Sequence, residues 1–97
     1  MRTIRLTSQF KKDLKREKKG IYKEVIKNEL PVVLDLLARD VTLPAKFVDH
    51  PLIGQKKHLK LRDCHIRPDL LLIYRKTDEG ELLILELIRL GSHSELF

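Results

Sequence analysis

The sequence predicts an α+β fold in which two helices pack on one face of an antiparallel sheet. Three observations support this prediction. A short alternating run opens the chain, two stretches with helical apolar spacing occupy residues 8–37, and three strand-like runs fill residues 58–90. Strands set apart from a run of helices are typical of α+β domains. The 97 residues suit a single domain over residues 1–97.

The first strand is expected over residues 2–6, where apolar and polar side chains alternate. Ser8 is suited to cap a helix that begins there. In the segment SQFKKDLKREKK, Phe10 and Leu14 share one face, and Lys or Arg occupies most of the other positions. Gly20 is well placed to end this helix.

A second helical pattern begins at Ile21. Its apolar residues fall at positions 21, 25, 26, 30, 33, 34 and 37, which is the spacing of a buried stripe. Pro31 interrupts the pattern, because proline lacks a backbone donor and disfavours α geometry in the residue before it. We therefore expect a kink near residues 28–30 and a two-helix hairpin joined near Gly20.

Residues 40–55 predict a loop, because they contain prolines and a glycine without a sustained period. An antiparallel meander of three strands is expected to follow, over residues 58–66, 70–76 and 81–90. The sequence TDEG at 77–80 predicts the hairpin turn between the last two strands. The run ELLILELIRL is so apolar that a central position in the sheet, covered on both faces, is expected for it.

Positive charge is concentrated in the first part of the chain. Residues 1–62 hold 16 Lys and Arg against 7 Asp and Glu, a net +9, whereas residues 63–97 hold 4 against 7, a net −3. This imbalance favours an anionic partner, most often a nucleic acid, although a solvated basic surface is the alternative.

Cys64 is the single cysteine, so an internal disulfide is excluded. The N-terminal residues lack the apolar stretch of a signal peptide, and no run approaches the ~18 apolar residues of a membrane span. We therefore expect a cytoplasmic protein that does not enter a membrane.

The segment LRDCHIRPD, residues 61–69, places many ionisable groups at the edge of the expected core. Alternation puts Asp63 and His65 on one strand face and Cys64 on the other. The apolar residues change from one face of this expected strand to the other partway along it. A bulge near residues 61–63 is one explanation, and a face that is partly in the core and partly at its solvent-exposed edge is the other. A carboxylate can tune a neighbouring imidazole into an acid or a base, although such pairs are more often surface ion pairs.

Two more histidines lie in expected loops, His50 in DHP and His93 in GSHS. Loops at strand ends often carry catalytic groups, although each histidine alone is more often a surface residue. The chain has no CxxC or HExxH spacing, and Cys64 and His65 are neighbours on opposite strand faces. A metal site, a cysteine nucleophile and a cofactor are therefore not expected.

This set of residues suits metal-free cleavage of RNA, which carries its own nucleophile in the 2′-OH. Histidines can serve as the base for that hydroxyl and as the acid for the leaving 5′-oxygen. Cations can stabilise the phosphate through charge-assisted hydrogen bonds, and the candidates near these segments are Arg62, Arg67 and Arg89. Phe97 could stack on a base.

Four stretches of the chain resemble the YafQ-type branch of the RelE/ParE toxin superfamily: DHPL at 49–52, RDCHIRPD at 62–69, LLIY at 71–74 and RLGSHSELF at 89–97. These proteins are toxins of bacterial type II toxin–antitoxin modules. The first 45 residues match only in element order and basic character. The resemblance implies a RelE-like fold, a ribosome-dependent endoribonuclease that cuts mRNA in the ribosomal A site, and a cognate antitoxin partner.

The resemblance places the active site on His50, Asp63, His65, Asp69, His93 and Phe97. It implies that His93 protonates the leaving oxygen, and that His50 or His65 is the base or stabilises the phosphate. The basic first helix would contact ribosomal RNA through phosphates, with a solvated helix face as the alternative, and the residues concerned are Lys11, Lys12, Lys15 and Arg16.

In the same comparison, Asp63 and Asp69 would orient the imidazoles, and Phe97 would stack on a nucleotide. Two departures from the family pattern stand out: Leu70 replaces a tryptophan, and Arg67 replaces an acidic residue. The competing functions are a gyrase inhibitor of the ParE type and an RNA-binding or interaction module without nuclease activity. The histidine set favours RNA cleavage over gyrase inhibition, whereas a binding module with incidental histidines stays open and would be distinguished by primer extension.

Overall fold

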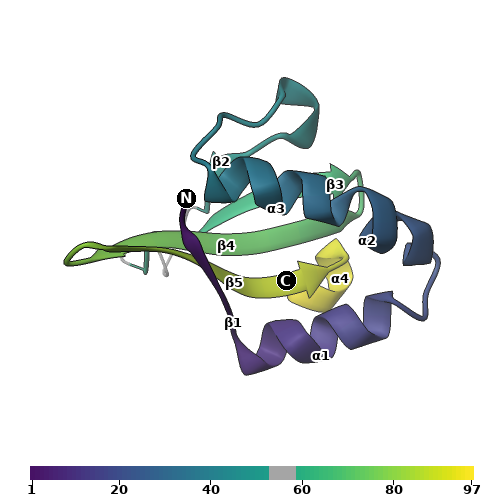
Figure 1. Cartoon of the computed structure of the whole chain (residues 1–97). Helices are drawn as coiled ribbons and strands as arrows, with labels where there is room; N and C mark the ends of the chain where they lie inside the picture. Colours follow the sequence, from purple (N-terminus) through teal and green to yellow (C-terminus); the bar gives the residue numbers. More distant parts are fainter. Residues whose placement is uncertain (53–58) are drawn as a thin grey trace.

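The computed structural model describes residues 1–52 and 59–97. In these residues one sheet has the strand order β1-β5-β4-β3-β2 (Figure 1). The strands are β1 (Thr3–Leu6), β2 (His50–Pro51), β3 (Arg62–Arg67), β4 (Leu70–Glu79) and β5 (Leu82–Gly91). The helices are α1 (Ser8–Glu17), α2 (Lys23–Asn28), α3 (Leu30–Ala38), the 3₁₀ turn η1 (Ala45–Phe47) and α4 (His93–Leu96).

The predicted meander is present as β3, β4 and β5, each antiparallel to the next. β1 differs from the prediction, because it pairs parallel to β5, with Thr3 opposite Ile84. The sheet is therefore mixed rather than antiparallel throughout. After the helices, the chain can enter the sheet in the same direction as its first strand, which gives a parallel pair. Side-chain alternation is the same in parallel and antiparallel strands, so the sequence does not indicate which pairing forms. β5 consequently lies between β1 and β4, as the apolar run predicted.

The hairpin turn is shorter and later than expected. Glu79 pairs with Leu82, which leaves Gly80 and Glu81 as the connection between β4 and β5. Gly80 has a φ of 63°, a conformation that glycine adopts without steric cost. Residues 77–79, predicted as part of the turn, therefore extend β4.

The helices begin and break close to the predicted positions. Thr7, rather than Ser8, caps α1, and its Oγ1 accepts a 3.1 Å hydrogen bond from the backbone N–H of Phe10. The second helix is interrupted at Glu29, where φ is −108°, and Pro31 then lies in the first turn of α3. Ile21 is 92% exposed and does not belong to the buried stripe, because α2 begins only at Lys23.

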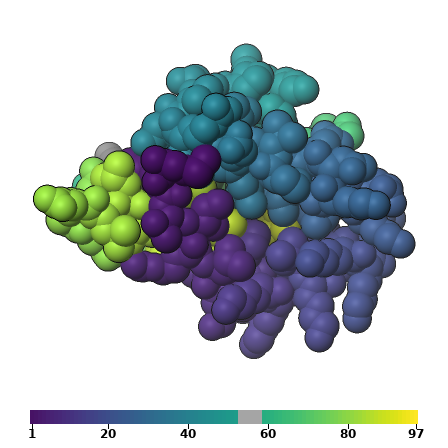
Figure 2. All heavy atoms as spheres, viewed as in Figure 1, coloured from purple at the N-terminus to yellow at the C-terminus, as the bar shows by residue number. Residues whose placement is uncertain are grey.

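The three larger helices cover one face of the sheet, and the chain reverses direction between α1 and α3 (Figures 1 and 2). One hydrophobic cluster joins helix residues such as Phe10 and Val33 to Cys64, Leu72 and Leu85 of the strands. Cys64 is fully buried, and burial raises the pKa of its thiol to about 12, as expected of a core residue rather than a nucleophile.

The opposite face of the sheet carries the polar segment of β3. Asp63 pairs with Ile73 and His65 with Leu71, so these side chains point away from the helices. The register shifts lie between His65 and Arg67 and between Ile73 and Tyr74, not near residues 61–63 as proposed. The start of the predicted strand at residue 58 lies outside the described residues. No helix in the described part of the chain is long and apolar enough to cross a membrane.

Candidate functional site

Three imidazoles from separate parts of the chain lie side by side. His50 is in β2, His65 is in β3, and His93 begins α4 immediately after β5. The ring centroids of His50 and His65 are 6.2 Å apart, and those of His65 and His93 are 5.4 Å apart. The pairing of β2 with β3 and the short turn into α4 therefore bring together residues that are up to 43 positions apart in the sequence.

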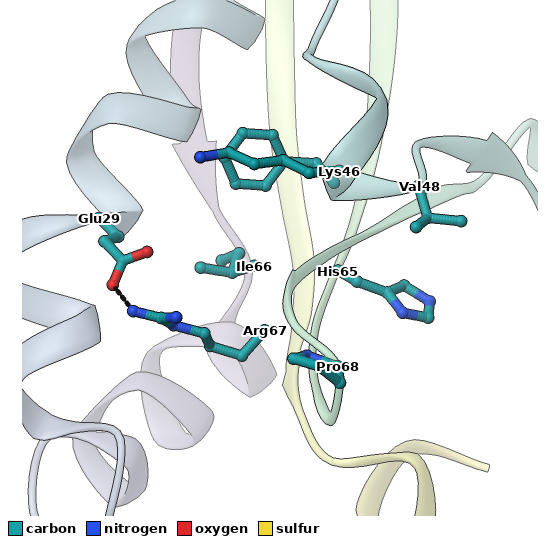
Figure 3. A pocket seen from close by; sticks show the side chains of 8 residues that line it. Glu29, Lys46, Val48, His65, Ile66, Arg67 and Pro68 are labelled. Carbon is teal, nitrogen blue, oxygen red and sulfur yellow. Dashed lines mark hydrogen bonds and ion pairs between the residues drawn. The ribbon is translucent and has the colours of Figure 1, made fainter.

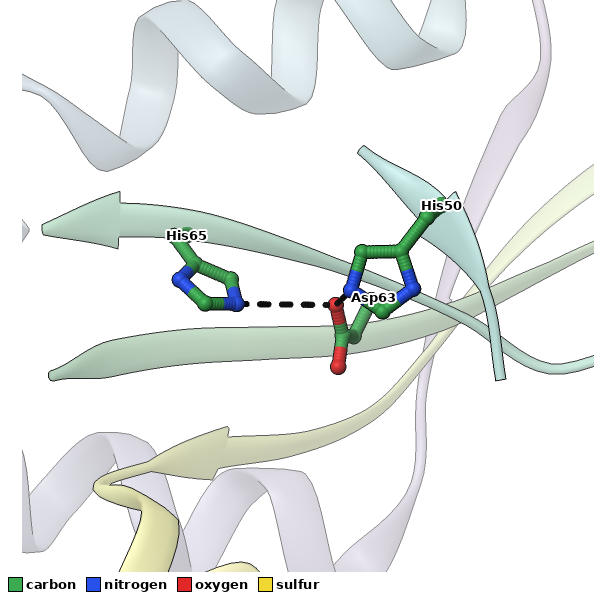
Figure 4. Close-up of side chains that lie close together, drawn as sticks. All are labelled: His50, Asp63 and His65. Atoms are coloured by element: carbon green, nitrogen blue, oxygen red, sulfur yellow. Dashed lines mark ion pairs between the residues drawn. The ribbon is translucent and has the colours of Figure 1, made fainter. Parts of the chain in front are cut away.

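Asp63 lies between two of these rings (Figure 4). Its Oδ1 is 2.7 Å from Nε2 of His50 and 3.8 Å from Nε2 of His65. The His50 contact lies outside hydrogen-bond geometry, so this buried oxygen has no hydrogen-bond partner among the described residues. Asp63 is 3% exposed, and burial raises the pKa of its carboxyl despite the three nearby imidazoles.

His50 is placed by the short strand β2, which lies in the segment predicted as a loop. His50 is paired with Asp63, and its Nδ1 lies 3.0 Å from the carbonyl oxygen of Pro51. A carbonyl can only accept, so the hydrogen of a neutral His50 ring belongs on Nδ1 and Nε2 faces Asp63. A neutral His50 therefore presents the lone pair of Nε2 to the Asp63 carboxyl, and a hydrogen on either group would make this close contact attractive.

His93 is fixed by Asp69, which lies in the turn immediately before β4. One oxygen, Oδ1 of Asp69, accepts the backbone N–H of His93 at 3.0 Å and lies 2.8 Å from its Nδ1. These hydrogen bonds lower the pKa of Asp69, the backbone one most, so the carboxylate is ionised and can only accept. The Nδ1 of His93 consequently carries a hydrogen, and its Nε2 is left to face a substrate.

α4 is held in place by its own cap and by α1. Ser92 and Glu95 form a capping box at the start of α4. Arg16 reaches from α1 to Glu95 at 2.9 Å and donates to the carbonyl of Leu90 at 2.8 Å. Arg16 was predicted to contact RNA, but the structure assigns its guanidinium to intramolecular pairs that anchor the segment carrying His93.

The other predicted arginines are also paired. Arg89 donates to Asp13 at 2.7 Å, and Arg67 pairs with Glu29. Arg62 points to the helix side of the sheet, since it alternates with Asp63, and its Nε lies 3.3 Å from Asp49. Arg62 therefore lies on the opposite face of β3 from Asp63 and His65, and its contact with an RNA phosphate stays a prediction.

The remaining predicted residues lie at the surface. Phe97 is 68% exposed at the end of α4, where its ring is accessible. Figure 2 shows long side chains projecting from the surface formed by α1 and the residues after it. Three exposed lysines of α1 have no salt bridge within the described residues, namely Lys11, Lys12 and Lys15.

Several supporting residues were not identified from the sequence. Tyr74 and Asp49, which lie 25 positions apart, are joined by a hydrogen bond that no local pattern indicates. Asp13 is fully buried and accepts from Arg89 and from the backbone of Leu90. A signal for Asp13 existed, because it lies three residues after Phe10, on the apolar side of the helix.

A metal could be held by part of the same cluster. Ligand atoms of His50, Asp63 and His65 all lie within 4.8 Å of one another. Two imidazole nitrogens and a carboxylate oxygen, with Asp63 Oδ1 lacking a hydrogen-bond partner in the described chain, fit a late transition-metal ion such as Cu²⁺ or Zn²⁺. The sequence had not predicted such a site, because its ligands come from two separate strands.

Residues 2–97 match the family described as the bacterial toxin of type II toxin–antitoxin systems, YafQ. The chain belongs to the YafQ toxin family. It is 38% identical to the mRNA interferase toxin YafQ of Escherichia coli K12, over 99% of this chain and 96% of that protein.

Two solved structures extend the comparison with YafQ. The E. coli DinJ–YafQ complex contains a chain with a TM-score of 0.79 and 39% identity, covering 100% of this chain and 99% of that one. A copper-bound mutant toxin from Helicobacter pylori has a TM-score of 0.81 and 39% identity, with 100% of both chains covered. The RelE-like α+β fold expected from the sequence is confirmed.

Proposed function

We propose that this YafQ-family toxin is an endoribonuclease that cleaves mRNA by acid–base catalysis through the RNA 2′-OH. The observation that supports this proposal is the convergence of three imidazoles, with adjacent ring centroids 6.2 and 5.4 Å apart. At this spacing, neighbouring rings can lie on either side of a phosphodiester bound at His65. The name of the E. coli relative, mRNA interferase, supports the same activity.

In the proposed reaction the 2′-oxygen attacks the adjacent phosphorus, and the bond from phosphorus to the 5′-oxygen breaks. A base removes the 2′-OH proton, and His93 donates a proton to the leaving 5′-oxygen, so that a 2′,3′-cyclic phosphate and a 5′-OH are formed. His93 suits the acid role because Asp69 holds its Nδ1 and leaves Nε2 free.

His50 and His65 are the candidates for the base. His50 is the imidazole in close contact with Asp63, whereas His65 lies between the other two rings. The one that is not the base would, when protonated, stabilise negative charge on the phosphate. A cationic imidazole would matter here, since Arg67 and Arg89 are engaged by carboxylates.

The ribosomal A site is the proposed place of cleavage, which assigns the protein to the cytoplasm. The free lysines of α1 would bind ribosomal RNA through phosphates, giving affinity without sequence preference. A cognate antitoxin is the second proposed partner, since the E. coli relative is found in a complex with DinJ.

The nuclease proposal is tested by primer extension on mRNA with translating ribosomes. We expect discrete cuts with the wild type and a loss of at least about 100-fold in rate for His93→Ala, the scale of one general acid. Ser94→Ala, which changes the neighbouring exposed residue, is the control and should cut normally. Intact message with the wild type would instead favour a binding or gyrase-directed function.

The role of α1 is tested with two charge reversals of equal size. Lys11→Glu with Lys15→Glu should weaken co-sedimentation with ribosomes and reduce its dependence on salt. Lys23→Glu with Lys27→Glu has the same spacing on α2 and is the matched control. Equal ribosome binding by both double variants would show that α1 is only a solvated surface.

A further inference from the structure

A hollow adjoins the imidazole cluster along the outer edge of β3. It lies between η1, the last residues of β3 and the start of α3, and has a cavity volume of about 370 Å³ (Figure 3). This volume falls within the range of about 300–1,000 Å³ that is usual for small-ligand sites. Apart from His65 at its edge, no residue that lines this hollow has one of the catalytic roles described above.

We propose that this hollow binds the nucleobase of a nucleotide that flanks the scissile phosphate, and that Glu29 selects bases that carry an amino group. The proposal rests on the proposed RNA cleavage, since the phosphate must lie at the imidazoles. It adds a base-binding subsite and a specificity residue to that reaction.

Continuity with the catalytic cluster is the first reason. His65 lines the hollow and also belongs to the imidazole group, with its ring centroid 5.4 Å from that of His93. In Figure 3 His65 and Ile66 project on opposite sides of β3, so the hollow passes over the strand edge toward the histidines. An RNA strand whose phosphate contacts His65 would therefore bring an adjacent base to the hollow.

The lining is the second reason, because it combines apolar walls with positive charge. Phe47 and Ile66 are buried beneath it, and Val48 and Pro68 add apolar surface that can contact the face of a base. Lys46 extends over the Phe47 ring, with Nζ 5.1 Å from the ring centroid. This cation is available to a phosphate next to the bound base.

Glu29 is the acidic residue of the lining, and it supplies the selectivity. Arg67 pairs with Oε2 of Glu29, which fixes the carboxylate, while Oε1 has no hydrogen bond to another described residue. A carboxylate accepts hydrogen bonds from exocyclic amino groups of adenine, cytosine or guanine. Uracil has no amino group, and its N3–H lies between two carbonyl oxygens that the carboxylate would also approach, so its pairing with Glu29 is weaker.

A peptide segment of a protein partner is the competing occupant, because the hollow follows a strand edge. The nucleobase is favoured by the shared His65 and by the cation at the rim. A hydrophobic peptide would use the apolar walls but would leave the ionised Glu29–Arg67 pair without a defined role.

The experiment uses the full-length protein, translating ribosomes and a set of messages that differ only at the two bases flanking the cut. With the wild type we expect at least one flanking position at which amino-bearing bases are cut about tenfold faster than uracil. Glu29→Gln should compress that ratio to about threefold or less, because the amide replaces a pure acceptor by a group that also donates. Glu24→Gln, an exposed residue of α2, removes the same charge outside the hollow and should keep the wild-type ratio.

The outcomes separate the two proposals. If no message is cut by the wild type, the nuclease proposal fails. If messages are cut and Glu29→Gln keeps the wild-type base ratio, the nuclease proposal stands and the base subsite is overturned. Calorimetry with the purified antitoxin identifies the peptide alternative: weaker antitoxin binding by Val48→Asp together with an unchanged base ratio in Glu29→Gln would assign the hollow to the protein partner.

Discussion

Tyr74 donates a 2.5 Å hydrogen bond from Oη to Oδ1 of Asp49, which joins the middle of β4 to the residue before His50. Tyr74 is 1% exposed, so its hydroxyl lies in the core, where an unpartnered polar group is costly. Burial and the adjacent carboxylate raise the pKa of this phenol, which therefore stays protonated and donates. We conclude that Asp49 is anchored from within the core and that His50 is positioned through it.

Tyr74→Phe should separate this anchoring from packing, because only the hydroxyl is removed. We expect the free energy of unfolding to fall by about 1–2 kcal/mol, and the cleavage rate to fall by roughly tenfold because His50 is less well positioned. Cleavage kinetics and denaturant unfolding would measure the two effects. Tyr22→Phe is the control, since no hydrogen bond of its hydroxyl occurs within the described residues; equal rate losses in both variants would contradict the positioning role.

The sequence predicted the elements that local chemistry determines. The break near Glu29 followed from Pro31, and a helix start near Ser8 followed from the capping preference of hydroxyl side chains, although Thr7 rather than Ser8 is the cap. The parallel pairing of Thr3 with Ile84 was not predictable, because it depends on a contact between residues 81 positions apart. The hairpin turn was predicted at residues 77–80 but lies at residues 80 and 81. Both segments contain residues that favour turns, so local sequence did not distinguish them.

In the candidate site, too, local motifs were predictable from the sequence and contacts between distant residues were not. Its histidines and aspartates were identified from their motifs, but their convergence required the sheet register that pairs His50 with Asp63. The arginines were assigned to RNA from their charge together with their place beside the histidine motifs or in the basic first helix. Arg16 is instead paired with Glu95, which lies 79 positions away, and Arg89 with the buried Asp13. Charge along a sequence therefore indicates a partner only after intramolecular ion pairs are known.

Asp69→Asn tests the orientation of His93. We expect about a tenfold slower cleavage at neutral pH, because a neutral amide holds Nδ1–H less firmly than a carboxylate does. The native pKa of Asp69 is lowered, so its contact stabilises the fold above the ordinary carboxyl range and is lost as pH falls through the lowered pKa. The wild type should therefore have a higher Tm than the variant at neutral pH, and this difference in Tm should disappear in acid.

The control for this change is Asp35→Asn, which removes an exposed carboxylate that pairs with Arg39. It should alter neither the cleavage rate nor the pH dependence of Tm in the same way. A difference in Tm for Asp69→Asn that grows as the pH falls would have the wrong sign and would reject the assigned hydrogen bonds.

Asp63→Asn should have the opposite effect on stability. Burial raises the native pKa of Asp63, so its ionisation opposes folding progressively as pH rises from the ordinary carboxyl range through the raised value. We expect the variant to be more stable than the wild type at neutral pH by on the order of 1 kcal/mol, with the gain vanishing in acid. Cleavage should nevertheless fall, because the carboxylate that lies against Nε2 of His50 is lost.

This combination would identify Asp63 as a residue whose charge is kept for function at a cost in stability. Thermal unfolding from acid to neutral pH, with cleavage measured on the same preparations, would test it. A variant that is less stable than the wild type at neutral pH would show that the carboxylate is instead stabilised by its imidazole neighbours.

Transition-metal ions should inhibit cleavage rather than support it. The ligand atoms of His50, Asp63 and His65 lie within 4.8 Å of one another. An ion bound by them would occupy the imidazole lone pairs that the proposed base needs. We expect Cu²⁺ or Zn²⁺ to bind the wild type, detected by calorimetry, and to stop cleavage until a chelator is added. His65→Ala should bind the ion more weakly, whereas Mg²⁺ should neither bind there nor inhibit, since it prefers oxygen ligands. Loss of wild-type cleavage in chelator, restored by Zn²⁺, would contradict this prediction and require a metal in the reaction itself.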